Sequence, residues 1–148
     1  MESTHDVEVC VRFASPRKEL SGQVRQAALA ALHHQDAPFD CTLTVVLSHD
    51  NHLRQLNRKY AGIDDTTDVL SFPYQDTIDP HYLGDIIISV ETAERQASVM
   101  GHNLLAELNV LTVHGTLHLL GHGHGNAATK ARMWQAQREI IFQLKTKV

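Results

Sequence analysis

Four short segments of the chain have the alternation or the composition of β-strands: residues 7–13, 41–48, 66–72 and 84–89. In the first, valines alternate with polar or small residues, the period-two pattern of a strand with one buried face. In the second, Leu43, Val45 and Leu47 point to one side. A loop rich in Asp and Pro, residues 74–83, separates the last two.

Five further segments have apolar residues at the three-and-four spacing of amphipathic helices: residues 16–34, 49–60, 91–100, 104–120 and 127–144. Residues suited to N-capping precede four of them: Ser15, Ser48, Ser89 and Asn103. Pro16 fits a first helical position, and Gly101 fits the end of the third helix. In the last helix we expect Met133, Ala136, Ile140 and Leu144 to face inward.

The predicted order of elements is βαβαββααα. Because the strands are grouped and do not alternate strictly with helices, the α+β class with a mixed four-stranded sheet is favoured over a doubly wound fold. A chain of 148 residues can bury one core without staples, so we expect a single domain over residues 1–148.

Composition excludes several classes of protein. With 43% hydrophobic and 20% charged residues the chain resembles an ordinary globular protein. Its apolar runs are too short to cross a bilayer and its N-terminus does not have the pattern of a signal peptide, so a cytoplasmic location is expected. Cys10 and Cys41 lack any paired spacing and are expected to be reduced thiols. The net charge of −4 means that attraction to nucleic acid would require a local basic patch.

The stretch HGTLHLLGHGHG, residues 114–125, contains the candidate chemistry. The inward stripe of the fourth helix continues at the same spacing into His114 and His118, whose rings would lie one above the other. Gly121 can end the helix in the left-handed conformation, and His124 then follows. These three histidines are the predicted metal ligands, with His122 off the ligand spacing.

Their spacing is that of the metzincin zinc-ligand helix, whose motif also contains a glutamate as general base. That position is Gly115 here, so peptidase chemistry of the usual kind is disfavoured. Three imidazoles suit zinc best, although nickel or copper would also bind. A fourth position would admit water, whose pKa zinc lowers to about 7, so hydrolysis is the expected reaction class and this metal-bound water the expected attacking group.

Beyond this cluster, the chain resembles the YbeY family of bacterial endoribonucleases and rRNA maturation factors. The sequence HGTLHLLGHGH matches the family's HGxLHLxGYDH, LNRKYAGIDDTTDVLSFP resembles LNxxYRGxDxPTDVLSFP, and LGDIIIS resembles its LGDIxIS block. The three blocks keep family order from about residue 56 to residue 124, with weaker similarity towards both ends.

The resemblance implies one zinc ion per chain, bound by His114, His118 and His124, beside a mixed four-stranded sheet. It also implies a metal-dependent, single-strand-specific endoribonuclease that processes the 3′ end of small-subunit rRNA and acts in ribosome quality control. Single-stranded RNA, rRNA and the ribosomal small subunit are the implied partners. The oligomeric state is not predicted.

The chain departs from the family pattern in three places. Ala61 replaces a functionally important arginine, His122-Gly123 replaces Tyr-Asp, and Thr66 replaces a proline. Arg58 or Lys59 is a candidate substitute for the missing arginine, with Arg58 better placed because three residues back shares a helix face. The second departure removes a carboxylate that could orient a ligand or a water molecule.

Supporting roles are assigned more broadly. Arg54, Arg58 and Lys59 are the candidate RNA-binding cations, and Arg58, Lys59 and Asp68 are the candidate supporting residues for catalysis. For Asp68 two interpretations stay open: orientation of the metal site, or capping of nearby amides. A structural role is favoured for Asp85. Trp134 and Phe142 are interpreted as core or surface aromatics, and six histidines as surface or loop residues: His33, His34, His49, His52, His81 and His102.

The general base is not identified. As an alternative to the enzyme, the same residues fit a ribosome-associated maturation factor that is weakly catalytic or non-catalytic, with a metal that is structural or that positions the substrate. The missing arginine and the missing aspartate favour that alternative.

Overall fold

The structure is a computed structural model that describes residues 6–11, 19–38, 40–74, 78, 81–123 and 125–146. Its elements in chain order are β1 (Asp6–Val11), α1 (Glu19–His34), β2 (Thr42–Ser48), α2 (Asp50–Ala61), β3 (Val69–Pro73), β4 (Tyr82–Ser89), α3 (Val90–Met100), α4 (Leu104–Leu119) and α5 (Ala127–Thr146). The α+β class and the five predicted helices are confirmed.

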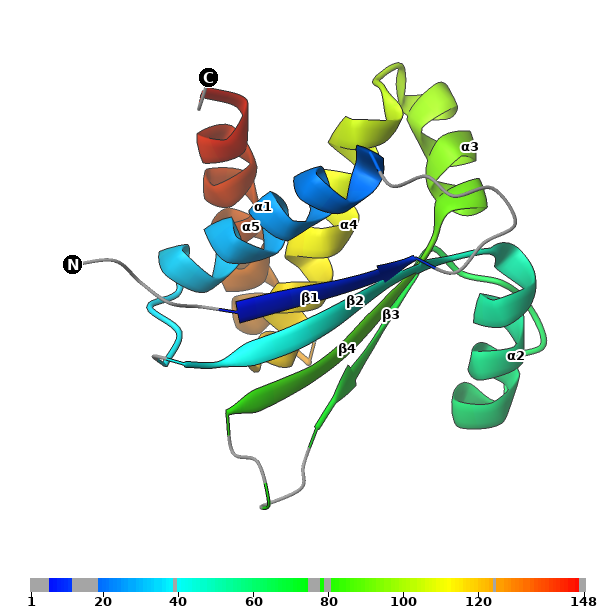
Figure 1. The fold of residues 1–148 in the computed structure, drawn as a ribbon, viewed down its shortest axis with the longest axis horizontal. Helices are drawn as coiled ribbons and strands as arrows, with labels where there is room; N and C mark the ends of the chain where they lie inside the picture. The colour runs from blue at the N-terminus through cyan, green and yellow to red at the C-terminus, as the bar shows by residue number, and fades with distance from the viewer. Residues whose placement is uncertain are drawn as a thin grey trace.

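The strands form one mixed sheet in the order β1-β2-β4-β3 (Figure 1). The pairs β1 with β2 and β2 with β4 are parallel, whereas β3 pairs antiparallel with β4 and forms an edge. Parallel neighbours need helical crossovers, which α1 and α2 provide.

Alternate residues of the central strands face different helices. Val45 and Ile86 belong to the main core, which α1, α3 and α4 cover. Their neighbours Val46 and Ile87 pack on the opposite face of the sheet against Leu53 of α2. Figure 1 shows α2 apart from α1, α4 and α5. Groups on α2 and groups on α4 are therefore separated by the thickness of the sheet.

Helices α1, α4 and α5 pack together through a second cluster. Ala27 and Ala31 of α1 lie against Val113 and Leu117 of α4, with Met133, Ala136 and Ile140 of α5. The small alanines allow close approach of the helices. The predicted inward residues of α5 are confirmed, except that Leu144 is only half-buried.

Most predicted helix ends are confirmed. Ser89 and Asn103 are N-caps whose side chains accept hydrogen bonds from the amides of Thr92 and Ala106, and Gly101 ends α3 with φ of 75°.

The prediction that Ser48 caps α2 was wrong. The N-cap is His49, which makes no capping side-chain bond, and the Ser48 hydroxyl instead contacts His52 Nδ1 at 2.7 Å. Phe13, Ser15 and Pro16 lie outside the described residues. Within the described part of the chain, none of the helices has the length and apolar character needed to span a bilayer.

Candidate metal centre

His114 and His118 lie one helical turn apart near the C-terminal end of α4. Their ring centroids are 4.7 Å apart, with the ring planes inclined at 69°. Both side chains are half-buried, between fully exposed and core positions. The two imidazoles that the spacing predicted to share a helix face therefore do so.

The chain turns sharply just after this pair. Gly121 has φ of 100°, its amide donates to the His118 carbonyl at 3.1 Å, and the His122 amide donates to the Leu117 carbonyl at 3.0 Å. These two bonds are those of a Schellman motif with glycine in its left-handed position. The predicted role of Gly121 is confirmed, and the turn directs the chain away from the helix before residue 124.

Gln137 of α5 contacts the first histidine. Its Oε1 lies 3.2 Å from His114 Nδ1. An amide oxygen only accepts, so this geometry favours the tautomer with a proton on Nδ1, in which Nε2 carries the lone pair of the ring. Helix α5 thus helps to orient the ring.

Gly115 lies where α4 packs closely on the sheet. A Cβ at this position would come within 2.7 Å of Ile86 Cγ2 and 3.1 Å of Ser71 Oγ. The Ser71 hydroxyl donates to the Gly115 carbonyl at 3.2 Å. A glutamate following the first histidine, as metzincins have, would not fit between this helix and this sheet.

Two histidines are not a complete metal site. His124, the third predicted ligand, lies outside the described residues, and the described ones include no group of three or more His, Cys, Asp or Glu side chains able to hold a metal. The described pair fits a divalent metal in donor type, spacing and partial burial. The full ligand set of His114, His118 and His124 stays a prediction.

Asp68 lies in the loop before β3 and binds local groups. Its carboxylate accepts from the Val69 amide at 2.8 Å and from Gln96 of α3 at 3.2 Å. These are contacts of a residue that orders a loop, the capping interpretation left open above. Its supporting role at the metal site stays a prediction.

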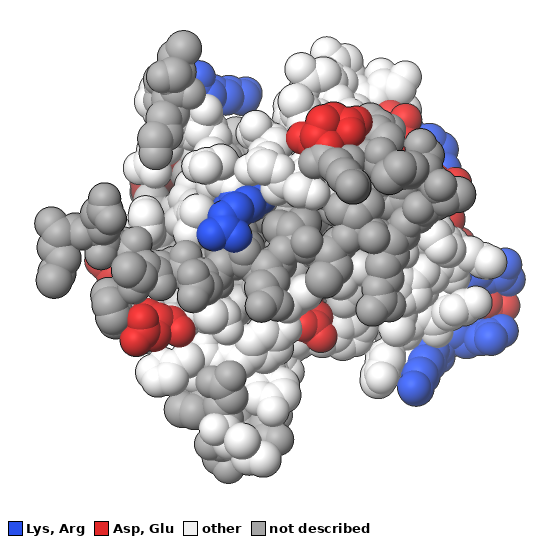
Figure 2. Space-filling view, viewed as in Figure 1, with Lys and Arg blue, Asp and Glu red and all other residues white. Residues whose placement is uncertain are grey.

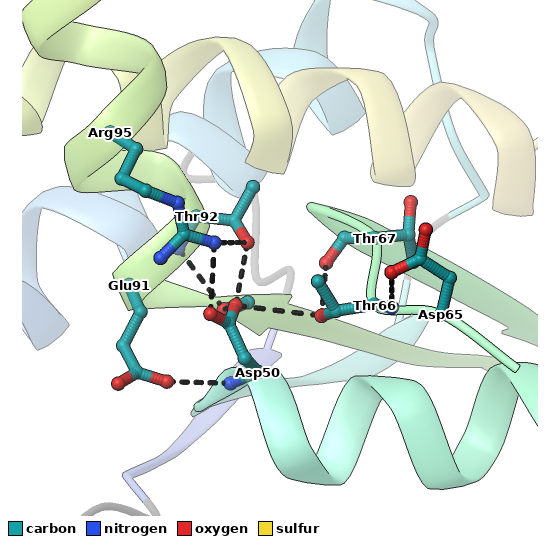
Figure 3. A network of polar contacts seen from close by, with 8 residues as sticks. Asp50, Asp65, Thr66, Thr67, Glu91, Thr92 and Arg95 are labelled. Carbon is teal, nitrogen blue, oxygen red and sulfur yellow. Dashed lines mark hydrogen bonds and ion pairs between the residues drawn. The ribbon is translucent and has the colours of Figure 1, made fainter.

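A polar network centred on Asp50 holds the same loop against the first turns of α2 and α3 (Figure 3). The Asp50 carboxylate accepts from Ser89 and Thr92 at 2.6 Å, from Arg95 at 2.8 Å and from Thr66 at 3.4 Å. Burial raises the pKa of Asp50, but the hydrogen bonds from Ser89, Thr92 and Arg95 outweigh it, so the pKa lies below its usual value. Thr66 contributes a hydroxyl that the family's proline lacks.

The predicted RNA-binding cations all lie on α2, and Figure 2 shows basic side chains gathered over this helix. Arg54 is already paired, with bonds of 2.8 and 3.1 Å to the two carboxylate oxygens of Asp64. Arg58 and Lys59 are exposed, and the Lys59 ammonium lies 5.2 Å from the Tyr60 ring centre. The sheet separates all three cations from His114 and His118, and their role in RNA binding stays a prediction.

A hollow of 440 Å³ lies between α2 and the sheet and includes Asp85 and His52 in its lining. Asp85 accepts a hydrogen bond from the Tyr82 hydroxyl, whose oxygen also lies 2.7 Å from the Thr44 hydroxyl oxygen. This contact between two side chains agrees with the structural role that is favoured for Asp85. Gly84 must be glycine because its φ is 140° and a Cβ would lie 2.2 Å from the Phe72 carbonyl oxygen.

The remaining histidines vary in environment. His33, His81 and His102 are exposed, as predicted, whereas His34, His49 and His52 are half-buried. His122, predicted to be a non-ligand, lies with its Nε2 2.6 Å from Gln35 Oε1. Cys41 is buried, and this burial raises the pKa of its thiol.

Comparison with known proteins decides the family. The model of the family described as endoribonuclease YbeY matches residues 9–145. The chain belongs to the YbeY family. It is 42% identical over 142 residues to the endoribonuclease YbeY of Heliobacterium modesticaldum, covering 86% of each chain. It is 44% identical over 137 residues to that of Thermus thermophilus, covering 90% of this chain and 94% of the relative.

The observed fold is similar to that of a solved structure. A Thermotoga maritima protein studied in solution superposes with a TM-score of 0.66, covering 94% of this chain and 89% of its own, at 22% identity. At that identity the likeness shows the fold alone.

The structure gives the surroundings of the residues that depart from the YbeY sequence pattern. Ala61 is the last residue of α2 and is exposed. Its methyl group cannot bind a phosphate because it has neither a charge nor a hydrogen-bond donor. Gly123 follows the Schellman turn and has open space around the position of a Cβ. The change from aspartate at that position therefore removes a charge without a packing reason.

Gln137 is the site residue that the sequence reasoning missed. It falls four residues after the inward-facing Met133, so it is a polar residue on a predicted core face of α5. That mismatch is the signal that could have identified it.

Proposed function

We propose that this chain is a zinc-dependent, single-strand-specific endoribonuclease that acts in rRNA maturation, including 3′-end processing of small-subunit rRNA, and in ribosome quality control. The observation that carries the proposal is the neighbouring pair His114 and His118, half-buried on one face of α4 in a YbeY-family chain. Its partners would be single-stranded RNA and the ribosomal small subunit.

His114, His118 and His124 would hold the zinc ion. A zinc ion there would supply an activated water and a positive charge close to a phosphodiester. The contact with Gln137 fixes the ring of His114, and the turn at Gly121 redirects the chain after His118. Gly115 presents no side chain that could act as a base, so the proton acceptor must be another group.

The test is cleavage of a defined single-stranded RNA by purified protein with and without bound metal. We expect cleavage by the loaded chain only, with loss on chelation, recovery with zinc, and loss in His118→Ala. The control is His122→Ala, a nearby histidine off the ligand spacing. Cleavage that persists unchanged in His118→Ala would contradict the proposal and indicate a contaminating nuclease.

The alternative is a metal-binding maturation factor with weak or no catalysis, which the methyl side chain of Ala61 favours. The variant Ala61→Arg separates the two. If an active site is merely weakened, the added guanidinium should raise the cleavage rate by about tenfold or more. An unchanged rate in a loaded, folded variant would favour the non-catalytic factor.

A further inference from the structure

The outer face of α5 combines exposed aromatic rings with positive charge. Trp134 is 59% exposed and Phe142 is 66% exposed. The Arg138 guanidinium lies 4.7 Å from the centre of the Trp134 ring. Rings that would gain by burial are thus held in solvent on a helix that packs its other face into the core.

Charge is distributed unevenly between this helix and the rest of the chain. Helix α5 has four basic residues and one acidic residue, Glu139, in a chain with a net charge of −4. The basic residues are Lys130, Arg132, Arg138 and Lys145. A local basic surface of this kind attracts a polyanion despite the acidity of the whole molecule.

Gln137 links this face to the histidine pair. Arg138 and Phe142 line two adjoining hollows, one of 850 Å³ around Trp134 and one of 360 Å³ against α4. The second hollow includes Gln137, which contacts His114. Figure 1 shows α5 alongside α4, on the side of the molecule away from α2.

We propose that Trp134, Arg138, Phe142 and Lys145 form a binding surface for single-stranded RNA that continues from the histidine pair along α5. This inference rests on the proposed function. The rings would stack on bases, and Arg138 and Lys145 would contact phosphates. The residues extend over about 16 Å of helix, enough to hold several nucleotides on one side of the cleavage position.

Single-stranded RNA fits this surface better than a protein partner does. Stacking rings interleaved with cations are the features that bind single strands without sequence preference. Trp and Arg are also frequent in protein interfaces, but the surface adjoins the candidate metal ligands of an endoribonuclease-family chain. A protein partner is therefore the competing outcome of the test.

Trp134 provides a direct probe because it is the only tryptophan in the chain. We expect a short 2′-O-methyl RNA, checked afterwards on a gel, to quench its fluorescence. Fluorescence anisotropy with a labelled oligonucleotide should give dissociation constants at least about fivefold higher for Trp134→Ala and Phe142→Ala. Arg138→Lys keeps the charge but loses the planar group, so it should weaken binding less than Arg138→Gln.

Arg25→Gln, an exposed cation on α1, is the matched control and should bind RNA as the unmodified chain does. Unchanged RNA affinity in a folded Trp134→Ala/Arg138→Gln/Phe142→Ala variant would overturn the proposal and favour a protein as the partner of this face. If that variant keeps its RNA affinity and its metal-dependent cleavage, the proposed α5 surface is wrong but the proposed nuclease function is not. If the variants lose RNA affinity as expected but the metal-loaded, unmodified chain cleaves no RNA, the α5 surface is supported and the nuclease function is wrong.

Discussion

Gly115 combines a packing requirement with the absence of a carboxylate. Its missing side chain is a steric requirement, since the methyl of Ile86 occupies the space that a Cβ would need. The same absence removes the carboxylate that a peptidase of the metzincin type uses as its base. Packing and chemistry are linked at this position.

We expect Gly115→Ala to lower the free energy of unfolding by about 1 to 2 kcal/mol, because overpacking against Ile86 outweighs the gain in helix propensity. Urea denaturation measures the difference. The control is Gly22→Ala in α1, where nothing lies within 4 Å of the new Cβ. That variant should gain about 0.5 to 1 kcal/mol. Equal effects of the two substitutions would contradict the close approach of α4 to the sheet.

Gln137 orients a candidate ligand from a neighbouring helix. Replacement by leucine keeps the volume but removes the acceptor for His114 Nδ1, so we expect zinc affinity to fall about tenfold. Competition with a chromophoric chelator measures it. Gln143→Leu, at an exposed position on the same helix, is the control and should bind zinc normally. Normal affinity in Gln137→Leu would show that the contact does not orient the ring.

At the scale of elements, the Asp50 network fixes how α2, α3 and the loop containing Asp68 meet. A single carboxylate accepts from residues of the β4–α3 junction, of α3 and of the loop before β3. Asp50 therefore links the start of α2 to the start of α3 by short bonds and to that loop by the longer contact with Thr66.

Asp50→Asn is expected to lose about 1 to 2 kcal/mol of unfolding free energy at neutral pH, since charge-assisted bonds are replaced by weaker ones. The lowered pKa of Asp50 means that this stability is present above the ordinary aspartate value and is lost as the pH falls through the lower, folded value. The gap between the two proteins should therefore narrow in acid. Denaturation curves at neutral and acidic pH test this. The control is Asp64→Asn, because Asp64 is exposed and also paired with an arginine, and its unfolding free energy should change little. A loss of stability in Asp50→Asn that is the same at neutral and acidic pH would contradict this prediction.

The elements themselves were largely predictable because their signals are local. Alternation, helical spacing and cap residues such as Ser89 and Asn103 operate within a few positions of the chain. The prediction for Ser48 was wrong because its side chain is suited to capping but lies one residue before the cap position. The backbone conformation makes His49 the N-cap. The site was only partly predictable: the shared face of His114 and His118 follows from spacing, whereas Gln137 and the face to which α2 turns its cations depend on how distant elements pack.

At the scale of the whole molecule, the sheet divides two surfaces. Helix α2, with Arg54, Arg58 and Lys59, covers one face, and α4 and α5 with the histidine pair lie on the other. Both surfaces have basic residues, so charge alone does not identify the surface that binds RNA. The contact of α5 with His114 makes the α5 side the shorter route to the candidate metal.

The proposed function depends on one metal ion bound by His114, His118 and His124. The most direct measurement is elemental analysis of protein purified without chelator or nickel resin, together with His118→Ala and His122→Ala. We expect one zinc ion per chain in the unmodified protein and in His122→Ala, and a His118→Ala variant that is folded but free of metal. A folded, unmodified chain that neither contains nor takes up a divalent metal, or a His118→Ala variant that binds it as tightly, would contradict the account.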